Sequence, residues 1–343
     1  MKNIQELFNT GKDLLKDHAD AGSEARILLC KSAKMSVETF HADGDRKLTR
    51  GQEQKFLRLV SKRLCGVPLS YLTNEREFWS LSFEVYPGVL IPRPESELIV
   101  EKVVELSKKG RPLSAKEPHK LNSDANKLAL KSQSLPVDAY KRSSEKSKQS
   151  LVKPEQSSEA NRTNERFADI GGKVIADIGT GSGNIAISLA RELPGVQVVA
   201  SDTSRTALKV ARMNAQKMRV SNVTVSQGSL FVPLDRLKLQ GKCDFIVSNP
   251  PYVSQKDWET LQPEVRDFEP KRALVAGKTG LEFIQKLVKG APQYLKPGGY
   301  LVFEIGFGQK EEVLSLFDES DNWTSVLCFN DLSGIPRVVV ARM

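Results

Sequence analysis

Two hydrophobic patterns divide the chain. Up to about residue 75, apolar residues recur every three or four positions, which is the spacing of amphipathic helices. Ile4, Leu7, Leu14 and Leu15 predict a first helix, and residues 25–33 predict a second. Thr49 has the character of an N-cap for a third helix. That helix is expected to place Phe56, Leu57, Val60 and Leu64 on one face. A small N-terminal helical bundle is therefore expected.

Later in the chain, short apolar runs alternate with helical patterns, which predicts a mostly parallel α/β sheet. The final two runs predict an antiparallel pair, and residues 78–89 alternate like a hairpin that links the two domains. The predicted strands are 174–178, 196–200, 223–225, 243–248, 300–305, 323–329 and 335–340. The predicted helices are 206–218, with Leu208, Ala211 and Met213 inside, then 281–294 and one within 306–317.

Asn249-Pro250-Pro251-Tyr252 follows the predicted strand 243–248 directly. The two prolines end the strand because neither offers a backbone N–H, and they hold Asn249 in an extended conformation. An asparagine oxygen, a free carbonyl and an aromatic ring can together grip a planar amino group. The alternative interpretation is a stiff turn that only fills a gap.

A glycine-rich turn follows the predicted strand 174–178 and leads into a helical pattern. It contains Gly179, Thr180, Gly181, Ser182 and Gly183. Strand, glycine-rich turn and helix form the first unit of nucleotide-binding α/β sheets. The next predicted strand ends near Asp202, where a carboxylate would hold ribose hydroxyls.

The spacing of the turn argues against a dinucleotide. Its pattern is G-x-G-x-G rather than G-x-G-x-x-G, and Asp177 precedes it, where a carboxylate would repel a pyrophosphate. A positively charged ligand without phosphate, such as S-adenosylmethionine, suits this turn. The combined motifs predict a methyltransferase, against the alternative of a plain βα turn.

Several further stretches carry a family resemblance: Pro68–Thr73, Glu77–Ser80, Leu90–Glu97, Glu264–Arg266, Phe268–Pro270, Ala273–Gly277 and Gly280-Leu281. With both motifs, the chain resembles the protein-(glutamine-N5) methyltransferases of peptide chain release factors (the HemK/PrmC type). The resemblance implies a Rossmann-like, seven-stranded methyltransferase domain behind the helical bundle. It also implies the domain boundaries 1–75 for a substrate-binding bundle, 76–92 for a hairpin linker and 93–343 for the catalytic domain.

The resemblance implies a role for each site residue. Catalysis would use Asn249, Pro250 and Tyr252, and substrate binding would add Pro251 and Arg93 to these three. S-adenosylmethionine would contact Gly179–Gly183, Asp202, Ser229, Leu230 and Asn249. Two departures from the family pattern are Ser229, where an acidic residue often stands, and Ser96, where threonine is usual. Arg93 and Glu95 could equally form a structural ion pair and a helix cap, and a glutamate at 304 is expected to be structural.

The implied substrate is the glutamine of the Gly-Gly-Gln tip of class-I release factors. Two alternatives stay open at this point. One is N-methylation of a ribosomal protein glutamine or of a nucleic-acid base. The other is a non-catalytic protein that binds ribosomal partners. We expect a monomer that does not require nucleic acid.

Composition limits the remaining possibilities. The chain has 343 residues with 39% hydrophobic content, enough for two domains with a core. Its four cysteines are far apart and its three histidines are scattered, which predicts neither a disulfide framework nor a metal site. No apolar run is long enough to cross a membrane, and the start of the chain lacks a secretory core. These features favour a cytoplasmic enzyme.

The formal net charge of +9 is concentrated in a segment at about 107–168. This segment holds fourteen Lys and Arg against seven Asp and Glu, and it is rich in Ser, Asn and Gln. Such a composition cannot bury enough surface to fold, so we interpret it as a low-complexity basic insertion. It could make weak electrostatic contacts with nucleic acid or a release factor. The simpler hypothesis is a tolerated surface loop without a role.

Overall fold

The computed structural model describes residues 1–109, 172–318 and 320–343, and these group into two compact units. Each unit is described by itself. The predicted basic insertion lies outside the described residues, except for its first three positions, which belong to the end of helix α6. No helix in the described part of the chain has the length and apolar character needed to span a membrane.

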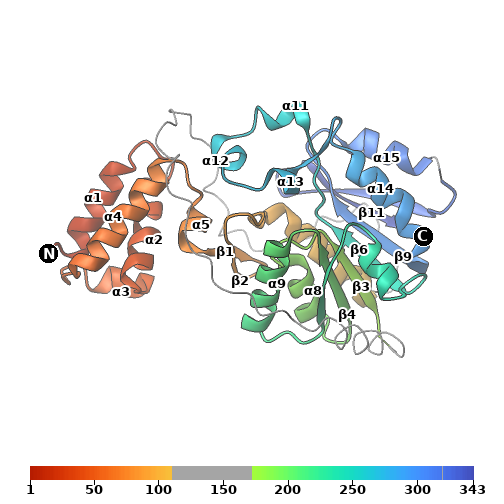
Figure 1. Cartoon of the computed structure of the whole chain (residues 1–343), viewed down its shortest axis with the longest axis horizontal. Coiled ribbons are helices and arrows are strands. Elements are labelled where there is room, and N and C mark those ends of the chain that lie inside the picture. Colours follow the sequence, from red (N-terminus) through yellow and green to blue (C-terminus); the bar gives the residue numbers. More distant parts are fainter. Residues whose placement is uncertain (110–171, 319) are drawn as a thin grey trace. The chain divides into compact units, whose positions relative to one another are not determined.

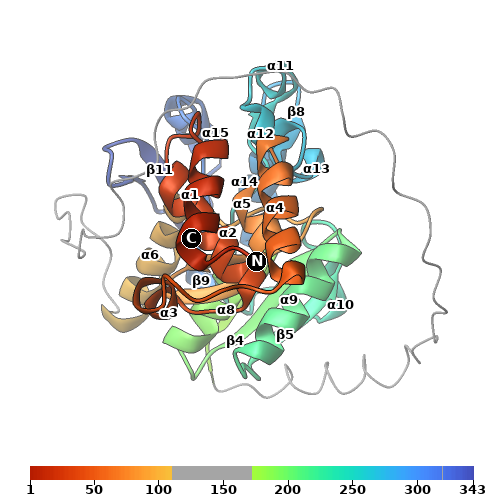
Figure 2. The same cartoon turned by 90° about the vertical axis from the view of Figure 1, so that its left-hand side faces the viewer.

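The first unit comprises Met1–Asn74 together with the segment Gln262–Phe268. Its longer helices α1, α2 and α4 lie side by side in both Figure 1 and Figure 2. The helices of this unit are α1 (Ile4–Leu14), α2 (Ala21–Ala33), α3 (Val37–Ala42), α4 (Arg50–Leu64), α5 (Leu69–Thr73) and α12 (Pro263–Arg266). The predicted bundle is confirmed, although the short helices α3 and α5 were not expected.

Side-chain caps begin four of these helices, and the cap predicted at Thr49 is confirmed. Asn3 and Thr49 each form a capping box at the beginning of α1 and α4, while Asp20 and Ser36 cap α2 and α3. Each cap satisfies backbone N–H groups that a helix start leaves free. One detail of the prediction was wrong: Leu64 is 49% exposed, because it lies in the last turn of α4, beyond the face that Phe56 and Val60 bury.

A buried arginine ties α12 to the bundle. Both ends of the Arg63 guanidinium contact the Glu24 carboxylate, at 2.9 and 2.8 Å, and its Nη1 lies 3.0 Å from the Glu264 carboxylate. Burial alone would lower the pKa of Arg63, but the two carboxylates outweigh burial and raise it. The Arg63 charge is therefore compensated by residues that lie far apart in the sequence.

The second unit is built on a seven-stranded sheet with the order β10-β11-β9-β6-β3-β4-β5 (Figure 1). Every pairing is parallel except those made by β11, which is antiparallel to both β9 and β10. The strands are β3 (Val174–Ile178), β4 (Gln197–Asp202), β5 (Val223–Gln227), β6 (Cys243–Ser248), β9 (Leu295–Glu304), β10 (Ser325–Asn330) and β11 (Pro336–Arg342). The predicted α/β class and the final antiparallel pair are confirmed.

Helices cover both faces of this sheet. On one face, α6 (Glu97–Lys109), α8 (Asn184–Glu192) and α9 (Arg205–Lys217) bury apolar residues together with Phe78 and Phe83. The latter two come from the hairpin of β1 (Glu75–Phe78) and β2 (Leu81–Glu84), which is confirmed as a hairpin and groups with this unit. On the other face lie α10 (Val232–Arg236), α14 (Glu282–Gly290) and α15 (Lys310–Asp318).

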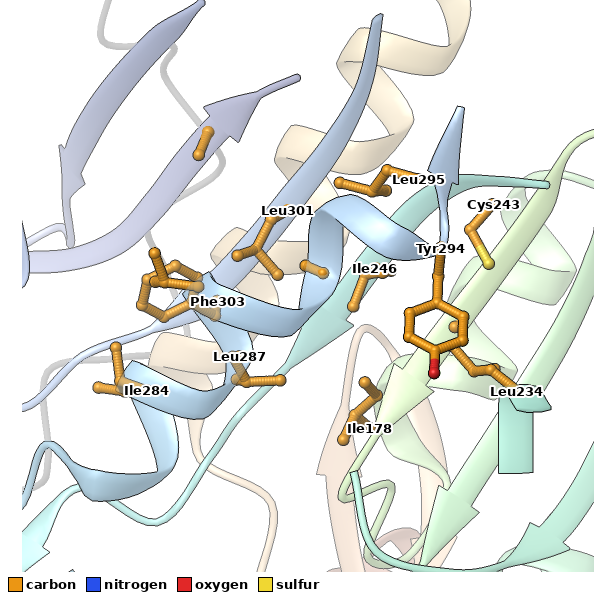
Figure 3. Packing of buried hydrophobic residues seen from close by; sticks show 14 of the residues in the cluster. Ile178, Leu234, Cys243, Ile246, Ile284, Leu287, Tyr294, Leu295, Leu301 and Phe303 are labelled. Atoms are coloured by element: carbon orange, nitrogen blue, oxygen red, sulfur yellow. The ribbon is translucent and has the colours of Figure 1, made fainter. Parts of the chain in front are cut away.

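The second core cluster is formed where α14 packs on the sheet. Figure 3 shows Ile284 and Leu287 of α14 directed toward Leu301 and Phe303 of β9. Ile178 and Ile246 continue this layer along β3 and β6, and all six side chains are at most 1% exposed. Because alternate strand residues face opposite sides, each buried parallel strand contributes to both clusters.

Two predicted boundaries and one predicted inner-face residue were wrong. The helix expected to reach residue 294 ends at Gly290, where an added Cβ would overlap the Phe231 ring, and a 3-10 turn over Ala291–Gln293 follows. Strand β9 begins at Leu295 rather than at residue 300, since Pro297-Gly298-Gly299 forms an irregularity within the strand pairing and does not precede it. Asn214, rather than Met213, belongs to the inner face of α9.

Four short elements complete the unit between β6 and α14. They are β7 (Val253–Ser254), α11 (Gln255–Trp258), α13 (Lys271–Leu274) and β8 (Val275–Gly277). The two strands pair in parallel, which holds the ends of this long excursion together. The domain boundaries expected from the sequence remain a proposal, and α12 is the one part of this excursion that groups with the helices of the first unit.

We predict that Gly11→Ala destabilises the helical unit although alanine favours helices. A Cβ on Gly11 in α1 would overlap the buried Phe56 ring and lie 3.3 Å from the Ala25 Cβ. The overpacking should cost about 1–3 kcal/mol of unfolding free energy, outweighing a propensity gain of about 1 kcal/mol. Thermal unfolding, with hydrogen exchange of α1 as the local readout, measures the effect.

Gly51→Ala is the matched control, because Gly51 lies in α4 of the same unit and a Cβ there meets only the Thr49 hydroxyl at 4.0 Å. It should leave the unfolding free energy unchanged or raise it by up to about 1 kcal/mol, because alanine favours the helix and nothing is overpacked. Equal effects of the two substitutions would contradict the packing argument.

Candidate active site

The two sequence motifs meet at one edge of the sheet. Strands β3 and β6 are parallel neighbours, so the glycine turn and the Asn-Pro-Pro-Tyr segment leave the sheet at the same end. The Ser248 hydroxyl donates to the Ile178 carbonyl at 2.7 Å and joins the two strand ends. A Cβ built on Gly179 would lie 4.0 Å from the carbonyl oxygen of Asn249. The structure thus brings together residues that the sequence separates by about seventy positions.

All three glycines of the turn have left-handed backbone angles, with φ of 79°, 56° and 83° at Gly179, Gly181 and Gly183. Residues with a Cβ disfavour these angles, which explains why glycine stands at all three positions. Gly183 is also crowded, because a Cβ there would lie 3.3 Å from the Ala211 Cα. Gly181 is different, since nothing lies within 4 Å of its missing Cβ. The backbone at Gly181 therefore borders open space that a ligand can approach.

Asp202 ends β4 and supports the same turn. One carboxylate oxygen accepts the Gly181 N–H at 3.0 Å and the other accepts the Ser204 N–H at 2.7 Å. Its backbone carbonyl accepts the Gly228 N–H at 3.1 Å, which places Ser229 and Leu230 at the neighbouring end of β5. The predicted cofactor residues therefore lie along the carboxyl ends of β3, β4 and β5.

Asp177 is a buried carboxylate beside this turn, with 1% of its surface exposed. Thr180 donates its hydroxyl to the carboxylate at 2.6 Å. Burial raises the pKa of Asp177 to about 7, and the nearby Asp202 charge acts in the same direction, while the hydrogen bonds from Thr180 and the Ala186 backbone oppose them. A cationic ligand would stabilise the ionised form.

A small, open pocket lies beside Asn249. It is lined by Leu90, Arg93, Asn249, Pro250, Tyr252, Ala273 and Leu274. Four of the five residues predicted for substrate binding thus line one pocket, and Pro251 is outside this lining set. The mixture of apolar walls and a few polar groups is typical of ligand sites.

Arg93 is held by a buried partner. Its guanidinium lies 2.5 Å from the carboxylate of Glu269, which is 1% exposed and also accepts the Ile91 N–H at 3.1 Å. Burial alone would lower the pKa of Arg93, yet the Glu269 charge outweighs it and raises the pKa. The ion pair suggested by the sequence exists, but its partner is Glu269 rather than Glu95. The side chain is still 28% exposed, so it can contact a bound molecule as well.

A buried network that the sequence interpretation missed lies behind Asn249. The Asn249 Nδ2 donates to the Ser96 hydroxyl at 2.7 Å, and that hydroxyl donates to Glu304 at 2.5 Å. The Tyr252 hydroxyl donates to the other Glu304 oxygen at 3.0 Å. Burial raises the pKa of both Glu304 and Tyr252. The only signal in the sequence was a charged residue at the end of an otherwise apolar strand.

Two more polar side chains position the motifs. Asn214 of α9 is fully buried and donates to the Ser182 carbonyl of the glycine turn at 2.9 Å. Gln309 donates to the Tyr252 carbonyl at 2.9 Å and accepts the Gly306 N–H at 2.8 Å. Gly280 leaves room for the Tyr252 carbonyl, since a Cβ there would come within 2.5 Å of that oxygen.

These residues fit S-adenosylmethionine. Two carboxylates, Asp177 and Asp202, flank the open backbone at Gly181 and suit a ligand that carries positive charge and ribose hydroxyls. A phosphate group would find no arginine or lysine among the contacts of this turn described above. The fold and the site define a methyltransferase that depends on S-adenosylmethionine, with a pocket beside Asn249 at the same edge of the sheet as the glycine turn.

Comparison with known proteins identifies the branch. Residues 164–264 match the methyltransferase small domain and residues 6–73 match the PrmC N-terminal domain. The chain is 35% identical to a release factor glutamine methyltransferase of Geobacter sulfurreducens, over 83% of this chain and 76% of that protein. It is 30% identical to the release factor glutamine methyltransferase of Coxiella burnetii, over 93% of this chain and 91% of that protein. It is 29% identical to the one of Bacillus cereus, over 99% of both chains. The chain belongs to the release factor glutamine methyltransferase family.

We predict that the affinity for S-adenosylmethionine falls as pH drops below about 7, the pKa of Asp177. The cationic cofactor favours the ionised carboxylate, so below this pH a proton must be lost on binding, which weakens binding by up to about tenfold per pH unit. Calorimetric titration between pH 5.5 and 8 in buffers of different ionisation enthalpy measures affinity and proton release together. Asp177→Asn should bind more weakly and lose the pH dependence. An unchanged dependence in this variant assigns the proton to another group.

Proposed function

We propose that the protein transfers a methyl group from S-adenosylmethionine to the side-chain amide nitrogen (N5) of the glutamine in the Gly-Gly-Gln motif of class-I peptide chain release factors. Family membership supports the reaction and the substrate class. The observation that carries the proposal in the structure is the pocket beside Asn249, which offers acceptor oxygens to an amino group at the edge where the glycine turn ends.

The acceptor residues act mainly by positioning. An amide nitrogen is a poor nucleophile, because its lone pair is delocalised, so its orientation toward the methyl group matters more than a strong base. Asn249 Oδ1 and the Pro250 carbonyl are the two acceptors for its N–H bonds. They also stabilise positive charge that develops on nitrogen, since they are fixed in place before the reaction.

The pocket walls contribute shape and charge. Pro250 is buried and rigid, while Tyr252 packs beside it with its hydroxyl already engaged by Glu304. Its raised pKa keeps the Tyr252 phenol neutral, so it serves as a wall rather than as a base. Leu90, Ala273 and Leu274 line the pocket and would shield part of a bound amide from water. The proton on nitrogen can leave to water after methyl transfer.

S-adenosylmethionine supplies an electrophilic methyl group when bound, and Gly179–Gly183, Asp202, Ser229 and Leu230 are proposed to hold it. Of these, Ser229 is exposed at the end of β5, where its hydroxyl is available to a ligand. The helical unit is proposed to bind the protein substrate. We further propose a cytoplasmic monomer that requires no nucleic acid, and the basic insertion could add a weak electrostatic contact.

The acceptor is tested by offering radiolabelled S-adenosylmethionine with a class-I release factor, ribosomal proteins, RNA or DNA in parallel. We expect label on the release factor only. A release factor with asparagine in place of the Gly-Gly-Gln glutamine is the matched control and should stay unlabelled. Label on a ribosomal protein or nucleic acid alone would overturn the proposed substrate, and label on none would favour a non-catalytic binding protein.

Asn249→Ala should separate binding from chemistry. Removing one fixed acceptor should lower kcat about 10²- to 10³-fold, the range for loss of one preorganised polar group. Affinity for S-adenosylmethionine should remain largely intact, because Asp177 and Asp202 keep their contacts with the glycine turn and α9. Equal losses in equilibrium binding and in single-turnover rate would instead show that Asn249 maintains the structure.

A further inference from the structure

An asparagine can serve as the acceptor for a methyl-accepting amide in only one of its two orientations. Its carboxamide has an oxygen end that accepts and a nitrogen end that donates, and the two ends are nearly identical in shape. If the nitrogen end of Asn249 faced the pocket, it would confront the amino group of the substrate with another donor. A neighbouring group must therefore fix which end of the Asn249 carboxamide faces the pocket.

The Ser96 hydroxyl is placed to fix this orientation. Its hydroxyl is 1% exposed and has a single hydrogen, which it gives to the Glu304 carboxylate at 2.5 Å. Toward Asn249 it can then offer only a lone pair. The 2.7 Å contact from Asn249 to the Ser96 oxygen is consistent only with the Nδ2 end on that side. The Oδ1 end is consequently left for the pocket.

Glu304 forces this direction of donation. It is 1% exposed, and in its ionised form it can only accept, so both hydroxyls around it then donate. Tyr252 donates to one oxygen and Ser96 to the other. The three anchoring groups come from three separate segments: the short helix η1 (Pro94–Ser96), the turn after β6 and the end of β9.

We propose that Ser96 and Glu304 are positioning residues that hold the Asn249 carboxamide with its oxygen toward the methyl acceptor. The inference rests on the proposed function and deepens it, because it assigns the orientation of the acceptor group to a buried hydroxyl and a buried carboxylate. Neither residue touches the substrate. Both act through Asn249.

This arrangement of hydrogen bonds requires the ionised form of Glu304. Its surroundings include the Ser96 and Tyr252 hydroxyls, the like charge of Glu95 and the opposite charges of Arg337 and Arg93. Burial raises the pKa of Glu304 above its usual value, with the hydrogen bonds from Ser96 and Tyr252 opposing. Once protonated, the carboxyl can donate to Ser96, which frees the Ser96 hydrogen for the oxygen end of Asn249 and permits the reversed orientation. Lowering pH through this pKa should therefore reduce kcat.

Three variants test the chain of donation. Glu304→Gln keeps the shape but replaces one acceptor oxygen with a donor nitrogen, and Ser96→Ala removes the hydroxyl between Glu304 and Asn249. Each should lower kcat about 10- to 100-fold at saturating substrates, the cost of an unpaired or reversed polar group. Their affinity for S-adenosylmethionine should match the unmodified protein. Ser96→Thr retains the hydroxyl and should recover most of the rate lost in Ser96→Ala.

Ser188→Ala is the matched control. Ser188 is a fully buried serine of α8 in the same unit, and its hydroxyl has no hydrogen-bond partner among the described residues. This substitution should leave kcat unchanged. If Ser188→Ala and Ser96→Ala lower kcat equally, loss of a buried hydroxyl as such explains the effect and the positioning role is wrong.

A readout independent of the methyl acceptor separates this inference from the proposed function. The two side-chain amide hydrogens of Asn249 can be assigned by the absence of their NMR signals in Asn249→Ala. One of them, the hydrogen donated to Ser96, should exchange slowly with water. It should exchange fast in Ser96→Ala and in Glu304→Gln. Fast exchange of both hydrogens in the unmodified protein would overturn the inference even if neither variant folds. Failure of the unmodified protein to methylate a release factor would overturn only the proposed function.

Discussion

The site depends on the parallel pairing of β3 with β6. Asp177 lies opposite Val247 in this register, so both strands end at nearly the same level of the sheet. The Ser248 hydroxyl, donated to the Ile178 carbonyl, ties those ends together where regular pairing stops. Had another strand stood between β3 and β6, the glycine turn and Asn249 would be about 10 Å apart at this edge, given the spacing of about 4.8 Å between neighbouring strands. Contact between donor and acceptor motifs is thus a consequence of strand order.

Buried carboxylates surround this edge, and each is stabilised in a different way. Glu269 has a cation, Arg93, and a backbone N–H. Glu304 has two hydroxyls, and Asp177 has one hydroxyl and a backbone group, with no cation among the causes of its pKa shift. A buried carboxylate without a cation is costly to ionise, and that cost falls when a cationic ligand arrives. Asp177 is therefore the carboxylate whose ionisation would respond to a cationic cofactor, whereas Glu269 holds Arg93 in the pocket lining.

Short patterns in the sequence correctly predicted those elements whose bounds depend on neighbouring residues. The strands over residues 174–178 and 243–248 match their predicted bounds, because fully buried parallel strands read as continuous apolar runs. Thr49 caps its helix as expected, since a capping box needs only residues within one turn. The end of the predicted helix 281–294 and the start of the predicted strand 300–305 were wrong, because both depend on distant contacts: Gly290 lies against the Phe231 ring, and Leu295 already pairs with β6.

The same distinction applies within the site. Asn249, Asp202 and the glycines carry their signal in short motifs, so sequence could identify them, and their roles remain predictions. Ser96 and Glu304 are separated by 208 positions, and Asn249 is 153 positions from Ser96. Neither spacing leaves a local trace, so Ser96 looked like a mild change from threonine and Glu304 like a structural residue. What makes them important is the direction in which one hydroxyl hydrogen points. That direction depends on which neighbours can only accept, and a pattern of residue types along the chain does not contain this information.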